Sequence, residues 1–374
     1  MKNRGRDIAV TIVFVFFLFA FFGINLLKSP EEISVSERRK LAMMPEFSGE
    51  NVKSTKFMTD FEKYALDQFP FREDFRRLKA KVLFDVFQQK DNHEIYIAEN
   101  QASAYKDKFN EVSVQDAAKK FNKLQKQFLL NMNVYYSVIP DKNYFLAEKN
   151  GYPHYNYAEF EKLLTSNVNE NLTYISLFDC LRPEDYYSTD THWRQEKLKN
   201  VVNRLGENMR FHKRFEEQNY ERSETHDFYG VFYGQSALPM EADVLVYLTN
   251  DAIKTAKVSI LDEETFEMKP AEVYAKEKLE GQDSYDVFLS GATALITIEN
   301  EQAETEKELY IFRDSYGSSL TPLLISEYKK ITMIDLRYIA TPALKQLVEW
   351  KDGQDALIIL CTDVINSSSI LKVF

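Results

Sequence analysis

Residues 309–317 read Leu-Tyr-Ile-Phe-Arg-Asp-Ser-Tyr-Gly, an apolar run that passes directly into charged and hydroxyl residues. The first four residues favour a buried strand, and residues 318–328 have a helical pattern. Open α/β sheets place their active sites at the carboxyl ends of such strands. The stretch therefore predicts an α/β fold with Ser315 at the functional edge of the sheet.

The chain on both sides repeats this alternation. Apolar, strand-like runs are separated by amphipathic stretches, which indicates a parallel sheet covered by helices on both faces. The expected strands are 95–98, 134–139, 172–177, 309–312, 331–334 and 356–361, and the expected helices are 57–89 (with a break near Pro70), 114–132, 157–164, 194–205, 318–328 and 343–350. Between 225 and 300 the pattern changes to short strands at 244–249, 272–275 and 294–299, which we interpret as a β-rich insertion or lid.

Residues 8–27 are almost wholly apolar. A helix of about 20 residues matches the ~30 Å hydrocarbon layer of a membrane. Lys2, Arg4 and Arg6 precede this run and favour a cytoplasmic N-terminus, with the catalytic domain outside. We expect an uncleaved single-pass anchor in the cell membrane rather than a cleaved signal peptide, because the run is long and no Ala-X-Ala site follows it. The expected organisation is a cytoplasmic tip with the anchor (1–29), a linker with little structure (30–55) and a catalytic ectodomain (56–374).

Composition narrows the function classes. The chain has 374 residues, of which 44% are hydrophobic, enough for one large core or a core with a subdomain. Its net charge of −11 argues against a nucleic-acid partner. The cysteines are Cys180 and Cys361, without a Cys-X-X-Cys spacing, so neither a disulfide framework nor a thiolate metal site is indicated, and no cofactor is expected. A single disulfide between the two remains open.

A second informative stretch is Tyr-Tyr-Ser-Thr-Asp-Thr-His-Trp at residues 186–193. A carboxylate such as Asp190, two residues before His192, can fix the tautomer of the ring and stabilise its protonated form. With Ser315, these two residues would make a hydrolase-type triad in the order Asp, His, Ser. Two other interpretations compete. Asp190 is also suited to capping a helix, and with His192 and His226 it is a conceivable metal site.

Several residues beside the triad are candidates for binding the substrate or an oxyanion. Backbone N–H groups from Ser315 to Gly317 precede a helix and can face a developing negative charge. Arg313 can hold an acidic sugar or a carboxylate, although a charge at a strand end is the plainer interpretation. The remaining candidates are aromatic residues that can stack on sugar rings or simply pack, namely Tyr186, Tyr187, Trp193 and Tyr316.

These segments together resemble the DHHW protein family, which is related to the SGNH-like O-acetyltransferases of the alginate acetylation family. The most specific matches are YYSTDTHW at 186–193 and RDSYGSSL at 313–320, followed by FEKYALDQFPFRE at 61–73. SVSERRKLAMMPEFS, YSVIPDKNYF and YDVFLSG also look like family blocks, and the likeness runs over most of the ectodomain. The chain has Asp-Thr-His-Trp where the family name implies Asp-His-His-Trp, a variation that leaves the triad complete.

The resemblance implies an SGNH-hydrolase-like parallel sheet flanked by helices, with Ser315 as nucleophile, His192 as general base and Asp190 as the orienting carboxylate. Gly317 is a candidate for the oxyanion-hole glycine of SGNH enzymes, but no asparagine lies beside it. The implied activity is O-acyl transfer, with acetyl expected, to a cell-envelope or secreted polysaccharide. The implied acyl donor is a multispanning membrane-bound O-acyltransferase. Two alternatives stay open: a carbohydrate esterase with the same triad, and a non-catalytic glycan-binding partner of a membrane acyltransferase.

Overall fold

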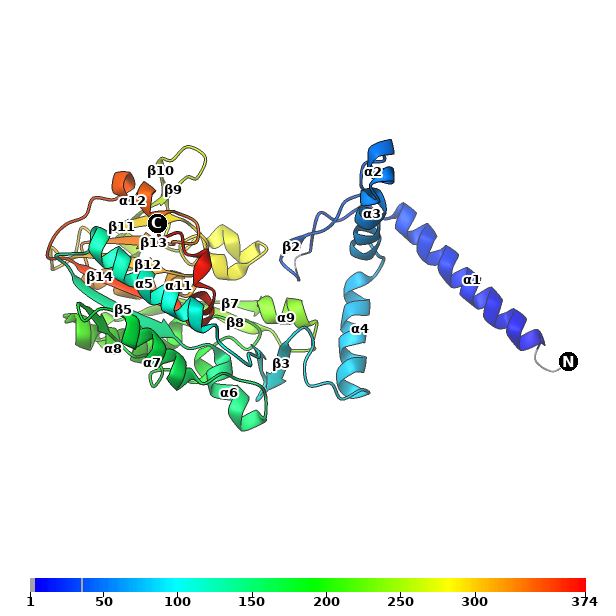
Figure 1. Ribbon diagram of the computed structural model, residues 1–374, viewed down its shortest axis with the longest axis horizontal. Helices are drawn as coiled ribbons and strands as arrows, with labels where there is room; N and C mark the ends of the chain where they lie inside the picture. Colours follow the sequence, from blue (N-terminus) through cyan, green and yellow to red (C-terminus); the bar gives the residue numbers. More distant parts are fainter. Residues whose placement is uncertain (1–3, 35) are drawn as a thin grey trace. The chain divides into compact units, whose positions relative to one another are not determined.

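The computed structural model describes residues 4–34 and 36–374 (Figure 1). It divides into two compact units. The N-terminal unit comprises the chain up to His93 together with Tyr233–Pro239, and the sheet unit comprises Glu94–Phe232 and Met240–Phe374. This division differs from the expected start of the catalytic domain at residue 56, because the helices that follow that residue make their contacts within the N-terminal unit.

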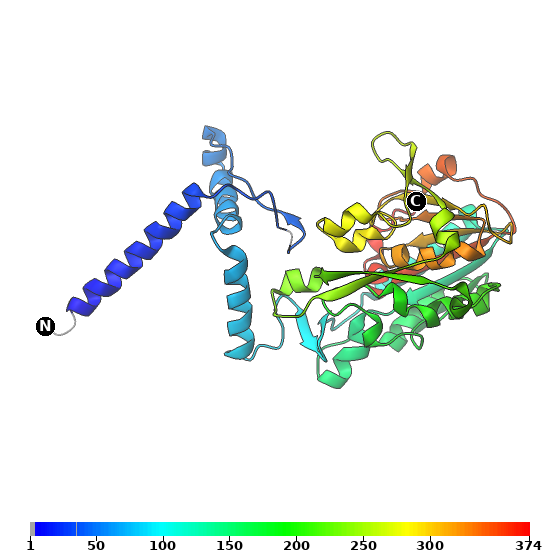
Figure 2. The same cartoon turned by 180° about the vertical axis from the view of Figure 1, so that it is seen from behind.

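The sheet unit is built on one central sheet (Figure 2). Within residues 94–374, eight strands pair in the order β10-β9-β11-β13-β12-β14-β5-β6. The strands from β13 to β6 are parallel, and β11, β9 and β10 extend the sheet as antiparallel strands. Their bounds are Asn133–Ile139 (β5), Leu172–Tyr174 (β6), Lys257–Leu261 (β9), Met268–Ala271 (β10), Leu295–Glu299 (β11), Glu308–Arg313 (β12), Lys330–Ile334 (β13) and Asp355–Cys361 (β14). The predicted α/β class with a mostly parallel sheet is confirmed.

Strands β12 and β14 lie side by side in the parallel part of the sheet, and every residue of both is buried. A strand that is covered on both faces does not alternate polar and apolar residues, which explains the continuous apolar runs in this part of the sequence. Phe312 pairs with Ile334 on one side and with Ile358 on the other. This packing fixes the carboxyl end of β12, two residues before Ser315.

Helices flank the central sheet. The helix α5 (Glu111–Phe128) crosses the front of the sheet in Figure 1 and is mostly hidden behind it in Figure 2. Asn110 caps α5 by accepting a hydrogen bond from the N–H of Ser113 at 3.1 Å. The others in the sheet unit are α6 (Lys142–Asn150), α7 (Tyr157–Asn167), α8 (Lys199–Met209), α10 (Asp251–Thr255), α11 (Tyr316–Leu320), α12 (Thr341–Leu347) and α13 (Thr362–Asn366), and α9 (Val231–Ser236) contains the point where the chain passes from one unit to the other.

The region that we interpreted as a β-rich insertion or lid requires a correction. Strands β9, β10 and β11 pair with the central sheet and form its antiparallel end. Only β7 (Glu221–Phe228) and β8 (Asp243–Thr249) form a separate two-stranded sheet there. The strand expected at 272–275 is displaced, since β10 ends at Ala271. Short strands that continue an existing sheet have the same local pattern as strands of an independent insertion, so the sequence does not distinguish them.

Two further predictions for the sheet unit concern the helix at 318–328 and a disulfide between the two cysteines. The helix expected at 318–328 is divided into α11 and a 3-10 turn, η6 (Thr321–Glu327), with Pro322 in the first turn of η6. Cys180 and Cys361 are both buried and free, so they do not form the disulfide that had remained open. A further pair of strands, β3 (Ile95–Ala98) and β4 (Gln101–Ala104), forms its own antiparallel sheet.

The N-terminal unit begins with α1 (Arg4–Leu27), whose Arg4–Asn25 span is long and apolar enough to cross a membrane or to be a signal sequence. The segment expected to have little structure, 30–55, contains the short antiparallel strands β1 (Ile33–Ser34) and β2 (Arg39–Lys40) and the helix α2 (Gly49–Lys53). Two longer helices, α3 (Lys56–Asp67) and α4 (Arg72–Asp85), follow it. The break between them falls around Pro70, as predicted.

Candidate active site

Asp190, His192 and Ser315 meet in the sheet unit, although 123 residues separate the histidine from the serine. Nδ1 of His192 lies 2.6 Å from Oδ1 of Asp190, and Nε2 lies 2.8 Å from Oγ of Ser315. Both distances are within hydrogen-bond reach. In this arrangement the imidazole can take a proton from the serine hydroxyl while the carboxylate holds its other nitrogen.

The carboxylate of Asp190 is fully buried. Besides the histidine ring, its Oδ1 accepts the backbone N–H of His192 at 2.9 Å, and its Oδ2 accepts the N–H of Val231 at 2.8 Å. Gly230 lies so close that a Cβ at this position would come 2.1 Å from Cβ of Asp190. Three N–H donors favour the ionised form of a buried carboxylate, so Asp190 is suited to stabilise a protonated imidazole.

The loop that carries Asp190 is tied to the β7–β8 sheet. Oδ1 of Asp243, at the start of β8, accepts the N–H of Ser188 at 2.8 Å. Its Oδ2 accepts the N–H of Thr189 at 2.8 Å and the hydroxyl of the same residue at 2.6 Å. A single buried carboxylate therefore holds the two residues directly before Asp190.

A buried lysine holds the same loop from another side. Nζ of Lys142, in the first turn of α6, donates to the carbonyl oxygens of Tyr187 at 2.8 Å and Ser188 at 3.3 Å. Burial lowers the pKa of Lys142 to about 7, opposed in part by the carboxylates of Asp190 and Asp243. The sequence indicates no role for Lys142 beyond its place in the YSVIPDKNYF block.

Ser315 lies between β12 and α11, where the sequence predicts it. Asp314 fixes this turn, because its Oδ1 accepts the N–H of Tyr316 at 3.0 Å and its Oδ2 accepts the N–H of Cys361 at 2.6 Å. The backbone of Ser315 is in the right-handed helical region, with φ −62° and ψ −25°. Asp314 is fully buried, whereas Ser315 is half-buried, so a substrate can approach the serine from solvent.

Two tyrosine rings contact the imidazole of His192. The ring of Tyr285 stacks on it, with centroids 3.9 Å apart, and the ring of Tyr316 lies at 4.9 Å with a tilt of 58°. The hydroxyl of Tyr316 donates to the carbonyl oxygen of Thr191 at 2.7 Å. Burial raises the pKa of both tyrosines well above the ordinary value, so both stay neutral. Sequence reasoning missed Tyr285, whose only signal is its place at the start of the YDVFLSG block.

The aromatic residues considered for sugar stacking lie in the interior. Tyr186, Tyr187 and Trp193 are fully buried, and Tyr316 is 3% exposed. Nε1 of Trp193 donates to Oγ of Ser319 at 2.9 Å. None of these four rings offers a face to a sugar in this structure. Of the two interpretations, stacking and packing, the burial of these rings supports packing.

Arg313 is also an interior residue, at 1% exposure. Its guanidinium lies 3.4 Å from Oδ2 of Asp335, just beyond β13, and donates to carbonyl oxygens of Gly291 and Thr293. Desolvation lowers its pKa, an effect that the carboxylate of Asp335 opposes. Arg313 thus joins the ends of neighbouring strands, and its guanidinium contacts Asp335 and not Asp190.

Gly317 is not available as an oxyanion donor, because its N–H donates to the carbonyl oxygen of Asp314 at 3.1 Å. A Cβ at Gly317 would lie 2.5 Å from Cβ of Arg313, so close packing is what requires glycine here. The N–H of Tyr316 is likewise used by Asp314. Of the three N–H groups considered, that of Ser315 remains, and within residues 4–34 and 36–374 it is paired with no acceptor.

Comparison with solved structures identifies the fold. A DHHW family protein from Eubacterium siraeum superimposes with a TM-score of 0.60 over 74% of this chain and 93% of that chain, at 17% identity. The chain shares its fold with this DHHW family protein. Bacillus cereus PatB1, whose structure carries a sulfonyl adduct, matches with a TM-score of 0.59 over 72% of this chain and 95% of that chain, at 16% identity.

The O-acetyltransferase domain of Pseudomonas putida AlgJ is also similar, with a TM-score of 0.42 at 9% identity over 73% of this chain and 92% of that chain. No protein-family model matches the chain, and no curated protein sequence matches it. The resemblance to a DHHW family protein is confirmed at the level of the fold, as is the mostly parallel sheet flanked by helices that it implied. At this level of identity the likeness establishes the fold alone.

Proposed function

We propose that this protein is a membrane-anchored, extracytoplasmic O-acyltransferase that moves an acyl group, with acetyl expected, to hydroxyl groups of a cell-envelope or secreted polysaccharide. The observation that carries the proposal is the 2.8 Å contact between Nε2 of His192 and Oγ of Ser315, with Asp190 on the other ring nitrogen. The fold shared with a DHHW family protein is consistent with it.

The first half-reaction forms an acyl-enzyme. Oγ of Ser315 attacks the carbonyl carbon of the acyl donor while its proton passes to Nε2 of His192. Asp190 stabilises the resulting imidazolium through Nδ1, and the ring then gives the proton to the leaving group. The new bond joins Ser315 Oγ to the acyl carbon, and the bond from that carbon to the donor is broken.

The second half-reaction transfers the acyl group. A sugar hydroxyl gives its proton to Nε2 of His192, and its oxygen attacks the acyl carbon. The bond to Ser315 then breaks, and the serine oxygen takes the proton back from the ring. The N–H of Ser315 is the backbone donor proposed to stabilise the negative oxygen in both steps, because it has no competing acceptor among the described residues.

The proposed acyl donor is a multispanning membrane-bound O-acyltransferase in the same membrane. The Arg4–Asn25 span supports this partner, because an anchor would keep the sheet unit near the membrane surface where a donor of this kind presents its acyl group. In the proposed topology the N-terminus lies inside and the sheet unit outside. The basic residues Arg4 and Arg6 before the apolar run favour this orientation.

Two serine variants test the proposal in the full-length protein. Ser315→Ala is expected to abolish both turnover of an activated acetyl ester and covalent labelling by a sulfonyl fluoride, a reagent chosen because PatB1 carries a sulfonyl adduct. Ser318→Ala is the matched control, since Ser318 is buried and its Oγ has no partner among the described residues. Wild-type turnover by Ser315→Ala would overturn the proposal. Hydrolysis that added oligosaccharide does not change would favour the esterase alternative.

A further inference from the structure

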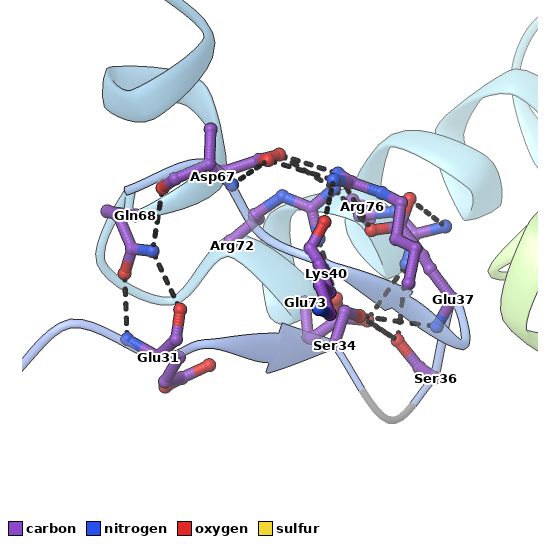
Figure 3. A network of polar contacts seen from close by, with 12 residues as sticks. Glu31, Ser34, Ser36, Glu37, Lys40, Asp67, Gln68, Arg72, Glu73 and Arg76 are labelled. Atoms are coloured by element: carbon purple, nitrogen blue, oxygen red, sulfur yellow. Dashed lines mark hydrogen bonds and ion pairs between the residues drawn. The ribbon is translucent and has the colours of Figure 1, made fainter. Parts of the chain in front are cut away.

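The second half of the FEKYALDQFPFRE block, residues 67–73, forms the corner between α3 and α4, and catalysis does not account for it. A polar network ties this corner to the segment after α1 (Figure 3). Gln68 donates to the carbonyl oxygens of Glu31 at 2.8 Å and Ala42 at 3.1 Å, and it accepts the N–H of Glu31 at 2.9 Å. Asp67 accepts the N–H of Ala42 and two N–H groups of Arg39. The guanidinium of Arg39 lowers the pKa of Asp67 to about 2, so the pair stays ionised.

The start of α4 takes part in the same network. Glu37 lies 2.6 Å from Arg72 and 3.5 Å from Arg76, and Oγ of Ser36 donates to Glu73 at 2.8 Å. Arg76 also donates to the carbonyl oxygen of Gly234 at 2.7 Å. The network therefore occupies one side of α4 and the corner, and it holds both close to the end of α1.

Three phenylalanines of this corner pack on α1 itself. The ring of Phe69 stacks on that of Phe21 with centroids 5.4 Å apart, and the rings of Phe75 and Phe71 lie at 5.9 and 6.4 Å. Phe21 lies within the Arg4–Asn25 span, four residues before its end, which corresponds to about 6 Å along a helix axis. If α1 crosses a membrane, these rings lie at the boundary between hydrocarbon and headgroups.

The face of α4 that continues from these rings is apolar and largely exposed. Phe71, Phe75, Leu78, Val82 and Val86 recur at helical spacing, with exposed fractions of 57, 39, 56, 36 and 69%. We call these five residues the α4 stripe. Phe71 has a φ of 58°, a left-handed conformation that is an outlier for a bulky side chain and that persists only where the surroundings impose it.

We propose that the α4 stripe, together with Phe69, lies in the outer leaflet of the membrane that α1 spans, as an interfacial helix. The proposal rests on the membrane anchoring given above. A helix of this kind buries its apolar face about 5–10 Å into the boundary region, which matches the depth of the Phe21 contacts. Its basic side chains outside the polar network, Arg77, Lys79 and Lys81, then reach the headgroups, in a chain of net charge −11.

An interfacial α4 would affect how the N-terminal unit is oriented on the membrane where the proposed reaction takes place. A helix that lies in the leaflet gives the N-terminal unit two attachments to the bilayer, α1 and the α4 stripe. Two attachments restrict the tilt of this unit relative to the membrane and its rotation about the axis of α1, whereas one helix alone does not. A lipid surface is the occupant that the contacts favour, because the stripe is continuous with rings that already pack on the apolar span.

Spin labels test this in the full-length protein, reconstituted in vesicles of phosphatidylcholine and phosphatidylglycerol. Leu78→Cys carries the nitroxide at the stripe, Phe16→Cys marks the middle of α1, and Glu263→Cys marks an exposed loop of the sheet unit. Lys81→Cys is the control on α4, exposed but outside the stripe. The native Cys180 and Cys361 add little background, because both are buried and burial raises the pKa of each thiol.

The expected result is that the Leu78 label is relaxed more by oxygen than by a water-soluble nickel chelate, as is the Phe16 label, while the Lys81 label is more accessible to nickel. A Leu78 label as accessible to nickel as the Glu263 label would overturn the proposal. Protection from both reagents would also overturn it, since a protein surface, either a partner or a second copy, would then cover the stripe. A water-accessible Phe16 label would refute the anchor as well, and the labelling of Ser315 would still report on catalysis independently.

Discussion

The ring of Tyr285 stacks on the imidazole of His192 with centroids 3.9 Å apart and planes inclined by 9°. Tyr285 comes from a 3-10 turn, η5 (Ser284–Val287), that is distant in the chain from both halves of the triad. Its hydroxyl is bound to Oγ of Ser319 at 2.8 Å, so the ring has a fixed position. A flat, buried surface therefore determines the plane in which His192 can sit between Asp190 and Ser315.

Removal of that surface should misplace the general base. Tyr285→Leu is expected to lower kcat about 10- to 100-fold, since a displacement of about 1 Å in a catalytic group has effects of this size. Tyr285→Phe keeps the ring and should retain near wild-type turnover. Steady-state kinetics on an activated ester measures the effect, and thermal melting shows whether each variant is folded. Equal losses in the two variants would assign the role to the hydroxyl instead of the ring.

We expect the carboxylate of Asp190 to act on catalysis by fixing which ring nitrogen of His192 carries the proton. Asp190→Asn places an amide beside Nδ1, which favours a proton on Nε2 and removes the base that faces Ser315. A loss of roughly 10⁴-fold in kcat is expected for this change in a serine triad. Asp179→Asn, an exposed carboxylate paired with Arg204, is the matched control and should be neutral. Full activity in Asp190→Asn would remove Asp190 from the mechanism.

Any side chain at position 230 is expected to destabilise the protein. A Cβ there would lie 2.1 Å from Cβ of Asp190, so Gly230→Ala must move the loop that carries the triad carboxylate. Such overpacking is expected to lower the free energy of unfolding by about 1–3 kcal/mol and to reduce turnover. Gly49→Ala is the control, because nothing lies within 4 Å of the position that its methyl group would take and its φ is not positive. Chemical denaturation in detergent compares the two, and equal stability would show that the loop can shift freely.

Lys142 should make the stability of the protein depend on pH. Its pKa of about 7 in the folded state lies below its ordinary value of 10.5, so between these values the unfolded chain binds more protons than the folded one. The contribution of Lys142 to the free energy of unfolding should therefore increase as pH rises from 7 to 10.5. Lys142→Met should remove this slope, whereas Lys149→Met, an exposed position on the same helix, should keep it. Urea unfolding at several pH values measures it, and an unchanged slope in Lys142→Met would contradict the assignment.

The sequence predicted the parts of the site that local pattern encodes. Ser315 follows an apolar strand, and Asp190 precedes His192 by two residues, so both halves of the triad are visible without a structure. The α/β class follows from the same alternation of strands and helices. The break at Pro70 is also local, since proline lacks the N–H that a helix interior requires.

The rest depends on contacts between distant segments. Nothing near Tyr285, Lys142 or Asp243 in the sequence indicates that they meet the triad, because each does so only through the packing of the sheet unit. The prediction of a lid at 225–300 is wrong for the same reason. Neither the sequence of β11 nor that of β13 indicates that these two strands pair. Likewise, burial of Trp193 could not be distinguished from exposure, because an aromatic residue beside a histidine suits both settings.

The contacts of Asp243 and Val231 with the Asp190 loop have a consequence for biosynthesis. Both residues are encoded between His192 and Ser315. A ribosome therefore adds the residues that orient the base before it adds the serine that faces it. Nascent chains, and fragments truncated ahead of Ser315, lack the hydroxyl that faces Nε2 of His192.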